Sequence, residues 1–129
     1  MRVVKPMWLL LFSLHLLAPP AHAQDQQTVL PTEALKYHLQ VKAVCGKIVG
    51  TQYAKRIPGQ PTLLHMGKPY PEQTFTIVIW ERDRGSFSKS PEELYKNREV
   101  CVTGLIVEHN GKPQIVVKSP YQVSVRQAE

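Results

Sequence analysis

The sequence predicts a small all-β domain of five strands, with one short helix between the third and fourth strands. Two observations support this fold class. Apolar and polar residues alternate in several separate segments, which is the period of a strand. A single strong helix-start signal, Ser90-Pro91-Glu92-Glu93, lies between the third and fourth of these segments. The chain has 129 residues, 43% hydrophobic and 20% charged, a globular balance at a length that favours one domain.

The N-terminal segment, residues 1–23, has the three parts of a secretory signal peptide. Arg2 and Lys5 precede an apolar run from Met7 to Ala18, and the small-x-small sequence Ala21-His22-Ala23 follows. The apolar run is shorter than the roughly 20 residues that span a bilayer. We therefore expect export to the periplasm or the medium, and no stable membrane insertion after cleavage.

After a polar, flexible lead-in at residues 24–30, the first elements of the domain follow. Helix formers after a proline predict one or two helical turns over Pro31–Tyr37. Alternation from Leu39 to Cys45 predicts a long first strand, which continues to Gly50 and bends at a glycine.

Two shorter strands are predicted next, after a loop that contains Pro58-Gly59. Thr62–Met66 is a short apolar strand that ends at Gly67. Thr74–Trp80 is the clearest strand, with Phe75, Ile77 and Ile79 on one face and Trp80 on the other.

The C-terminal part begins with the helix. Ser90 and Glu93 have the spacing of a capping box, which predicts a helix from Pro91 to about Asn97. A fourth strand is expected over Glu99–His109, a tight Asn110-Gly111 turn next, and a fifth strand over Gln114–Lys118. Val123–Val125 adds a tail. Five strands with a helix after the third is the architecture of the OB-fold barrel, here assigned to residues 31–125.

The two cysteines of the exported part, Cys45 and Cys101, lie on the first and fourth strands. These strands are neighbours in an OB barrel, and disulfides persist in oxidising compartments. A structural disulfide is the favoured interpretation. Two reduced core thiols are the alternative, and the C-x-x-C spacing of a redox pair is absent.

The order of several short motifs resembles the small exported bacterial OB-fold nucleic-acid-binding domains, including those joined to secreted nucleases. The motifs are Pro31-Thr32-Glu33-Ala34, Val44-Cys45-Gly46-Lys47-Ile48-Val49, Pro61-Thr62-Leu63-Leu64, Pro69-Tyr70-Pro71, Phe75-Thr76-Ile77-Val78-Ile79-Trp80, Val102-Thr103-Gly104 and Gly111-Lys112-Pro113-Gln114-Ile115. The resemblance covers about residues 31 to 123 and implies a binding module. It carries no catalytic signature.

OB barrels bind ligands on the face of the second and third strands, between the loops that join strands one to two and four to five. Cations and aromatic residues in this region are the candidate contacts for a nucleic-acid strand. They are Lys55, Arg56, His65, Lys68, Tyr70, Trp80, Arg82, Arg84 and Lys112. Trp80 either forms a stacking platform or covers the rim of the barrel, and each basic cluster is either a phosphate contact or a solvated loop.

Catalysis is not expected. His38, His65 and His109 fall on separate elements without metal-ligand spacing, and the exported part has few aspartates for a two-metal centre. Without Arg2 and Lys5, 14 basic residues face 10 acidic ones, a mild excess of +4. We expect a non-enzymatic module without cofactor or metal that binds single-stranded DNA or RNA with little sequence preference. The alternative is an envelope protein or glycan bound on the same face.

Overall fold

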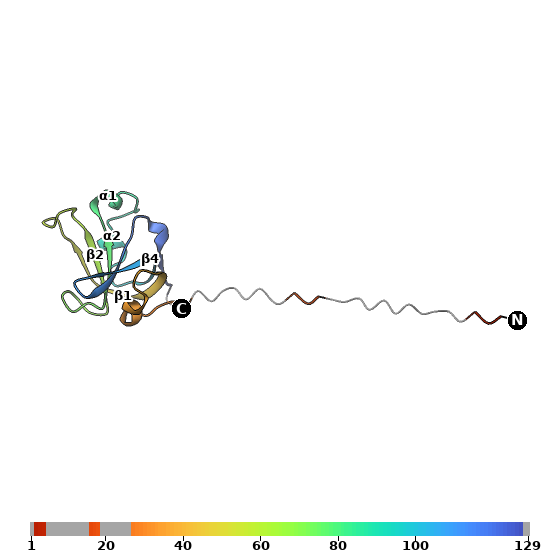
Figure 1. Cartoon of the computed structure of the whole chain (residues 1–129). Helices are drawn as coiled ribbons and strands as arrows, with labels where there is room; N and C mark the ends of the chain where they lie inside the picture. Colours follow the sequence, from red (N-terminus) through yellow and green to blue (C-terminus); the bar gives the residue numbers. More distant parts are fainter. Residues whose placement is uncertain (1, 5–15, 19–26, 128–129) are drawn as a thin grey trace.

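The computed structural model describes residues 2–4, 16–18 and 27–127 (Figure 1). Most of the expected signal peptide, residues 1–23, lies outside these residues. None of the described helices is long and apolar enough to cross a membrane. The elements, in chain order, are η1 (Pro31–Tyr37), β1 (Val41–Tyr53), β2 (Thr62–Met66), β3 (Phe75–Ile79), α1 (Glu81–Arg84), α2 (Pro91–Leu94), β4 (Glu99–His109), β5 (Lys112–Val116), η2 (Pro120–Gln122) and β6 (Val123–Val125).

Five strands form a closed ring, and this confirms the predicted OB-like fold. The strands follow the order β1-β2-β3-β5-β4, and β4 pairs with β1 to close the ring. Only the β3–β5 pairing within this ring is parallel. β1 pairs with two strands: residues 41–47 pair with β4, and residues 48–53 pair with β2. A register shift between Ile48 and Gly50 separates the two halves and lets the strand bend. β6 adds to the outer edge of β4.

The interior is filled by layers of aliphatic side chains. Leu64, Ile77, Ile115 and Ile106 are register partners across β2, β3, β5 and β4, and all four are 0% exposed. Val44 and Val102 form an equivalent buried pair between β1 and β4. The alternation predicted for these strands therefore places the expected residues in the core.

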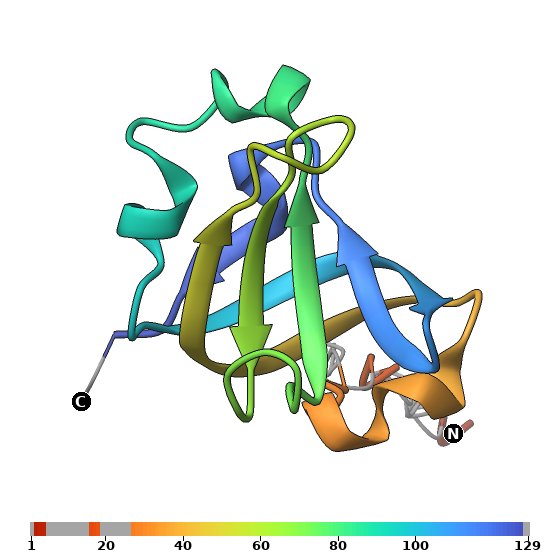
Figure 2. The ribbon, with the colours of Figure 1, turned by 90° about the vertical axis from the view of Figure 1, so that its left-hand side faces the viewer.

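Short helical segments close the two ends of the ring. η1 covers one end with Ala34, which is fully buried. Val29, expected in the lead-in, also belongs here, because it is buried and forms a bridge to Val44. The α1–α2 segment lies toward the other end (Figure 2), and buries Phe87 and Tyr95 in an edge-to-face pair at 6.1 Å between ring centroids.

The helix prediction between β3 and β4 needs correction. Two four-residue helices occur there, and α1 occupies a segment for which no helix was predicted. α2 ends at Leu94 rather than near Asn97, and the Ser90 side chain makes no cap hydrogen bond. The Ser90 carbonyl instead accepts from the Glu93 and Leu94 amides. Asn97 has a φ of 58°, a left-handed conformation that a right-handed helix does not continue through, so the predicted helix cannot extend to it.

The Asn110-Gly111 turn forms as predicted. Its two residues have φ values of 50° and 77°, the positive values that a type I′ hairpin turn requires. The turn sets β4 against β5, so that His109 faces Lys112 across the hairpin.

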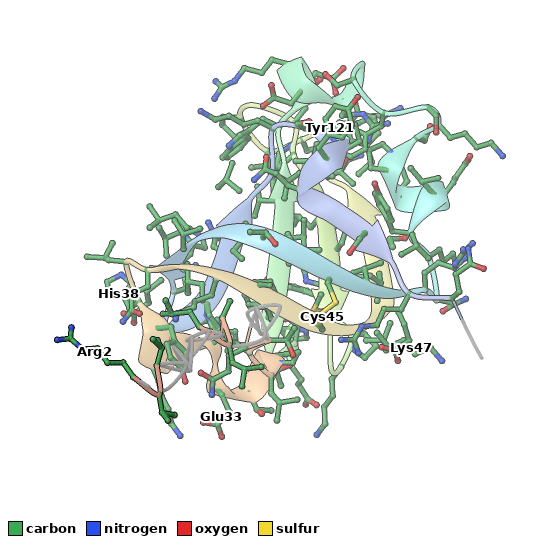
Figure 3. All side chains as sticks on the ribbon, turned by 90° about the vertical axis from the view of Figure 1, so that its right-hand side faces the viewer. Arg2, Glu33, His38, Cys45, Lys47 and Tyr121 are labelled. Carbon is green, nitrogen blue, oxygen red and sulfur yellow. A yellow bond between two sulfur atoms is a disulfide. The ribbon has the colours of Figure 1, made fainter. Side chains whose placement is uncertain are left out.

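Cys45 and Cys101 are direct cross-strand partners on β1 and β4 and form a disulfide, which confirms the favoured interpretation. Both side chains are part-buried on the outer side of the β1–β4 sheet (Figure 3). The bond closes a loop with a sequence separation of 56, so it restricts the unfolded chain strongly.

We predict that the Cys45→Ala/Cys101→Ala variant unfolds at lower urea concentration than the wild type. The expected loss in the free energy of unfolding is about 2–4 kcal/mol, because the unfolded chain regains the entropy of a long loop. Urea titrations followed by tryptophan fluorescence, with reduced wild type alongside, measure the loss. A change below about 0.5 kcal/mol, the size typical of a neutral surface substitution, would contradict this role.

Candidate functional site

Strands β2, β3 and β5 lie side by side (Figure 2), and their register places two parallel rows of side chains on the outer face. Partners in register point to the same side of a sheet. Leu63, Val78 and Val116 form an apolar row, and His65, Thr76 and Gln114 form a polar row beside it. This face lies opposite the inner layer of Leu64, Ile77 and Ile115, so the face is outside the barrel core.

A groove of about 630 Å³ lies over this face. Both rows form its floor, through residues such as Leu63, Val78 and Thr76. Aromatic residues stand near its two ends: Trp80, directly after β3, and Tyr70, in the loop between β2 and β3. The face is unusually covered for the outside of a sheet, because Val78 is 4% exposed and Thr76 is 7% exposed. The groove thus offers a flat ligand both apolar surface and hydrogen-bonding groups.

A second hollow of about 630 Å³ adjoins the groove at the β1–β2 loop. Lys55, Arg56 and Arg82 line it together with Glu81 and the loop backbone. The Arg82 side chain is 73% exposed, so its charge faces solvent. Lys55, Arg56 and Arg82 outnumber the nearby carboxylates, which are Glu81 and the Asp83 group that lies 3.7 Å from Arg82 Nε, so the local charge favours an anion.

Trp80 belongs to both hollows and forms the wall between them. The β1–β2 loop packs against its ring at Gly59, where a Cβ atom would lie 2.9 Å from the tryptophan Cε3. Gly59 also has a φ of 81°, so a side chain is excluded by both conformation and space. The Trp80 ring is therefore held in place by the loop while another part of the side chain remains open to the groove. Trp80 therefore packs against the loop at the rim of the barrel, and its role as a stacking platform stays a prediction.

The other end of the groove contains Lys112, which donates a hydrogen bond to the Pro71 carbonyl. This contact joins the β5 hairpin to the β2–β3 loop across the groove. Lys68 is exposed in the same loop but does not line either hollow.

Arg84 is placed differently from the other predicted cations. Its guanidinium pairs with Glu92 through two bonds of 2.7 and 3.1 Å, lies 3.7 Å from the centre of the Tyr53 ring, and donates to Thr62. The side chain is 15% exposed and lines neither hollow. Its hydrogen bond to Glu92 raises the pKa of Arg84 and lowers the pKa of Glu92. Arg84 therefore ties α1 and α2 to the barrel rim.

His65 is buried in the groove floor, with 3% of its surface exposed. Its Nδ1 atom lies 3.2 Å from the Thr76 hydroxyl. Burial lowers the pKa of His65, and the positive charge of Lys112 lowers it further. The imidazole is thus neutral at neutral pH and acts through hydrogen bonds rather than charge.

Several groove residues escaped the sequence analysis. Gln114 was placed on a strand, but only the parallel pairing of β3 with β5 shows that it joins the row of Thr76. Gln73 and Asn110 lie in turns, where polar residues are too common to single out. Thr76 and Val78 could have been identified from the sequence, because the alternation along the strand places them on the same face as Trp80.

Comparisons with known proteins bear on the fold alone. No protein-family model matches the chain, and no curated protein matches it. Among solved structures, the chain is similar to a putative aspartyl-tRNA synthetase from Leishmania major Friedlin, with a TM-score of 0.50 and 7% sequence identity. The similarity covers 83% of this chain and 22% of that one. The chain therefore spans about a fifth of that protein's length and shares its fold in that part.

Within the described residues, no group of three histidine, cysteine or acidic side chains is placed to hold a metal ion. The two hollows offer apolar and aromatic surface, neutral hydrogen-bonding groups and cations.

We predict that the Arg84–Glu92 pair makes stability depend on pH. A lowered carboxyl pKa in the folded state stabilises the fold above the ordinary value of 4.5, and this contribution is lost as the pH falls through the lower, folded-state pKa. Glu92→Gln should therefore lose less stability than the wild type between pH 6 and pH 3, by about 1 kcal/mol.

Urea unfolding at several pH values measures this difference. The matched control is Glu93→Gln, which changes the adjacent exposed carboxylate and should keep the wild-type pH dependence. Identical pH profiles for Glu92→Gln and the wild type would show that the pair does not contribute.

Proposed function

We propose that this domain binds single-stranded nucleic acid along the β2–β3–β5 face. The observation that carries the proposal is the joining of an aromatic, part-apolar groove to a cationic hollow through one residue, Trp80. Single-strand-binding proteins combine these two features, because bases stack on aromatic rings while cations follow the phosphates. The similar fold of part of a putative aspartyl-tRNA synthetase is compatible with this proposal, as is the resemblance to exported OB-fold nucleic-acid-binding domains.

In this proposal, the bases lie in the groove and the backbone passes over its ends. Lys55, Arg56 and Arg82 contact phosphates at the β1–β2 loop. Lys112 and the exposed Lys68 provide positive charge toward the opposite end. Arg84 positions α1 and does not contact the strand, because Glu92 and Tyr53 already surround its guanidinium. Contacts to phosphates and to flat base faces do not depend on sequence.

We infer that the domain acts outside the cytoplasm, in the periplasm or the medium. The signal-peptide pattern of residues 1–23 and the Cys45–Cys101 disulfide both support this setting.

We predict that a labelled 15-nucleotide single strand binds with strong salt dependence. Lys55, Arg56, Arg82 and Lys112 line the two hollows, and we assume that each neutralises one phosphate. Four neutralised phosphates give about a fifty-fold loss of affinity between 50 and 200 mM salt, because binding releases counterions. Arg56→Gln/Arg82→Gln should weaken binding at 50 mM salt and reduce the slope of log affinity against log salt by about 1.4. Fluorescence anisotropy measures both quantities.

The matched control is Lys47→Gln/Lys96→Gln, which removes the same charge from exposed residues outside both hollows. Lys47 is on β1 and lies near the Cys45 disulfide (Figure 3). Equal loss of affinity in the two double variants would mean that net charge, rather than this site, drives binding. No binding at 50 mM salt would reject the function and favour an envelope protein or glycan as the ligand of the same groove.

A further inference from the structure

Among the described residues, the cationic hollow at the β1–β2 loop is lined by a single carboxylate, that of Glu81. This carboxylate is already engaged by groups that do not line the hollow. Its Oε2 atom accepts a hydrogen bond from the Tyr53 hydroxyl and lies 3.6 Å from the Arg84 Nε atom. Within the described part of the chain, its ion pair is therefore with Arg84 and not with a cation of the hollow.

Tyr53 is well placed to hold this carboxylate. It is the last residue of β1, and its register partner on β2 is Thr62. Arg84 contacts both residues of this pair, because its guanidinium lies 3.7 Å from the centre of the Tyr53 ring and donates to the Thr62 hydroxyl. The hydrogen bond to Glu81 raises the pKa of Tyr53, so the hydroxyl stays protonated and donates at neutral pH.

The Tyr53 ring also contacts a cation of the hollow. The Lys55 Nζ atom lies 5.2 Å from the centre of the ring, within the range of a cation–π contact. Tyr53 thus contacts a lining residue of each charge, Lys55 through its ring and Glu81 through its hydroxyl. Replacing tyrosine with phenylalanine keeps the ring and removes the hydroxyl, so the two contacts can be tested separately.

The hydroxyl is the shorter of the two contacts that hold Glu81. Arg84 is 3.6 Å away and is committed to Glu92 through two bonds of 2.7 and 3.1 Å. The Glu81 side chain is 49% exposed, so without the hydroxyl it has room to rotate. A released carboxylate would compete with phosphate for the cations of the hollow, because lysine and arginine donate to both groups.

We propose that Tyr53 is a positioning residue for phosphate binding, whose hydroxyl keeps the Glu81 carboxylate from occupying the cations of the hollow. This inference rests on the proposed function and adds a residue that lines neither the hollow nor the groove. Tyr53 acts through Glu81 and does not itself contact the strand.

The test is a double-mutant cycle, read by fluorescence anisotropy of a labelled 15-nucleotide single strand at pH 7.5 and 50 mM salt. Tyr53→Phe should weaken binding about three-fold, the strength of one exposed ion pair between the released carboxylate and a cation of the hollow. Glu81→Gln should bind at least as tightly as the wild type, because it removes a negative charge from the hollow. In the Glu81→Gln background no charge is left to release, so Tyr53→Phe should leave the affinity unchanged.

Two matched controls use residues outside both hollows. Tyr121→Phe removes a hydroxyl from a side chain that is 99% exposed (Figure 3) and should keep the wild-type affinity. Glu93→Gln removes an exposed carboxylate on α2, and Tyr53→Phe should still weaken binding in that background. The urea midpoint of each variant verifies that it folds.

The outcomes separate this inference from the proposed function. Strand binding that is the same in Tyr53→Phe and the wild type would overturn the positioning role and leave the binding function intact. An equal loss with and without Glu81→Gln would also overturn it, because the ring or the loop would then be responsible. Absence of binding by the wild type would overturn both. A loss that Glu81→Gln abolishes and Glu93→Gln does not supports the role of Tyr53.

Discussion

Strand β1 pairs with two different strands, and the rest of the structure depends on this double pairing. Its first half pairs with β4 and its second half with β2, so one continuous segment joins the two ends of the strand order. The register shift near Gly50 allows the turn between the two halves. The Cys45–Cys101 bond lies within the first pairing and keeps the two strands joined even in the unfolded chain. Without this closure, β2, β3 and β5 would form an open sheet with exposed edges.

Closure of the barrel also gives the inner and outer faces of the sheet different environments. The inner side chains, such as Ile77 and Ile115, are fully buried and provide the hydrophobic stabilisation. The outer face of the same strands lies outside this inner layer and borders the groove. The β1–β2 loop reaches one end of this face with Lys55 and Arg56, and the β4–β5 hairpin reaches the other with Lys112. Arg84 fixes the first of these ends by binding α1 to α2.

The sequence was sufficient to predict the fold because its strands are amphipathic and its turns are marked by specific residues. Alternation placed Phe75 and Ile79 inside, and Asn110-Gly111 set the final hairpin, features that depend only on local chemistry. The Cys45–Cys101 pairing followed from the strand order of the OB barrel. The short helices were less predictable, because the Arg84–Glu92 contact joins residues whose proximity depends on the folded loop.

The candidate site was only partly predictable, for the same physical reason. Trp80 and Lys112 could be chosen by residue type and loop position. Gln114 could not, because it joins the groove through a parallel pairing between strands far apart in the chain. The opposite roles of Arg82 and Arg84 also depend on tertiary contacts, since one side chain is 73% exposed and the other 15%. Sequence shows that both are basic, but only the folded loop shows that Arg82 points to solvent beside Asp83 while Arg84 is enclosed by Glu92 and Tyr53.

The central claim is that the β2–β3–β5 face is the binding surface for a single strand. Titration of isotope-labelled protein with oligo-dC, followed by backbone amide NMR shifts, tests this claim most directly. The account predicts that the amides of Leu63, Val78 and Gln114 shift progressively. The amide signals of Ala43 and Thr103, which lie near the disulfide on the opposite β1–β4 sheet, should not shift. Shifts concentrated on the β1–β4 sheet, with the groove residues unchanged, would contradict it.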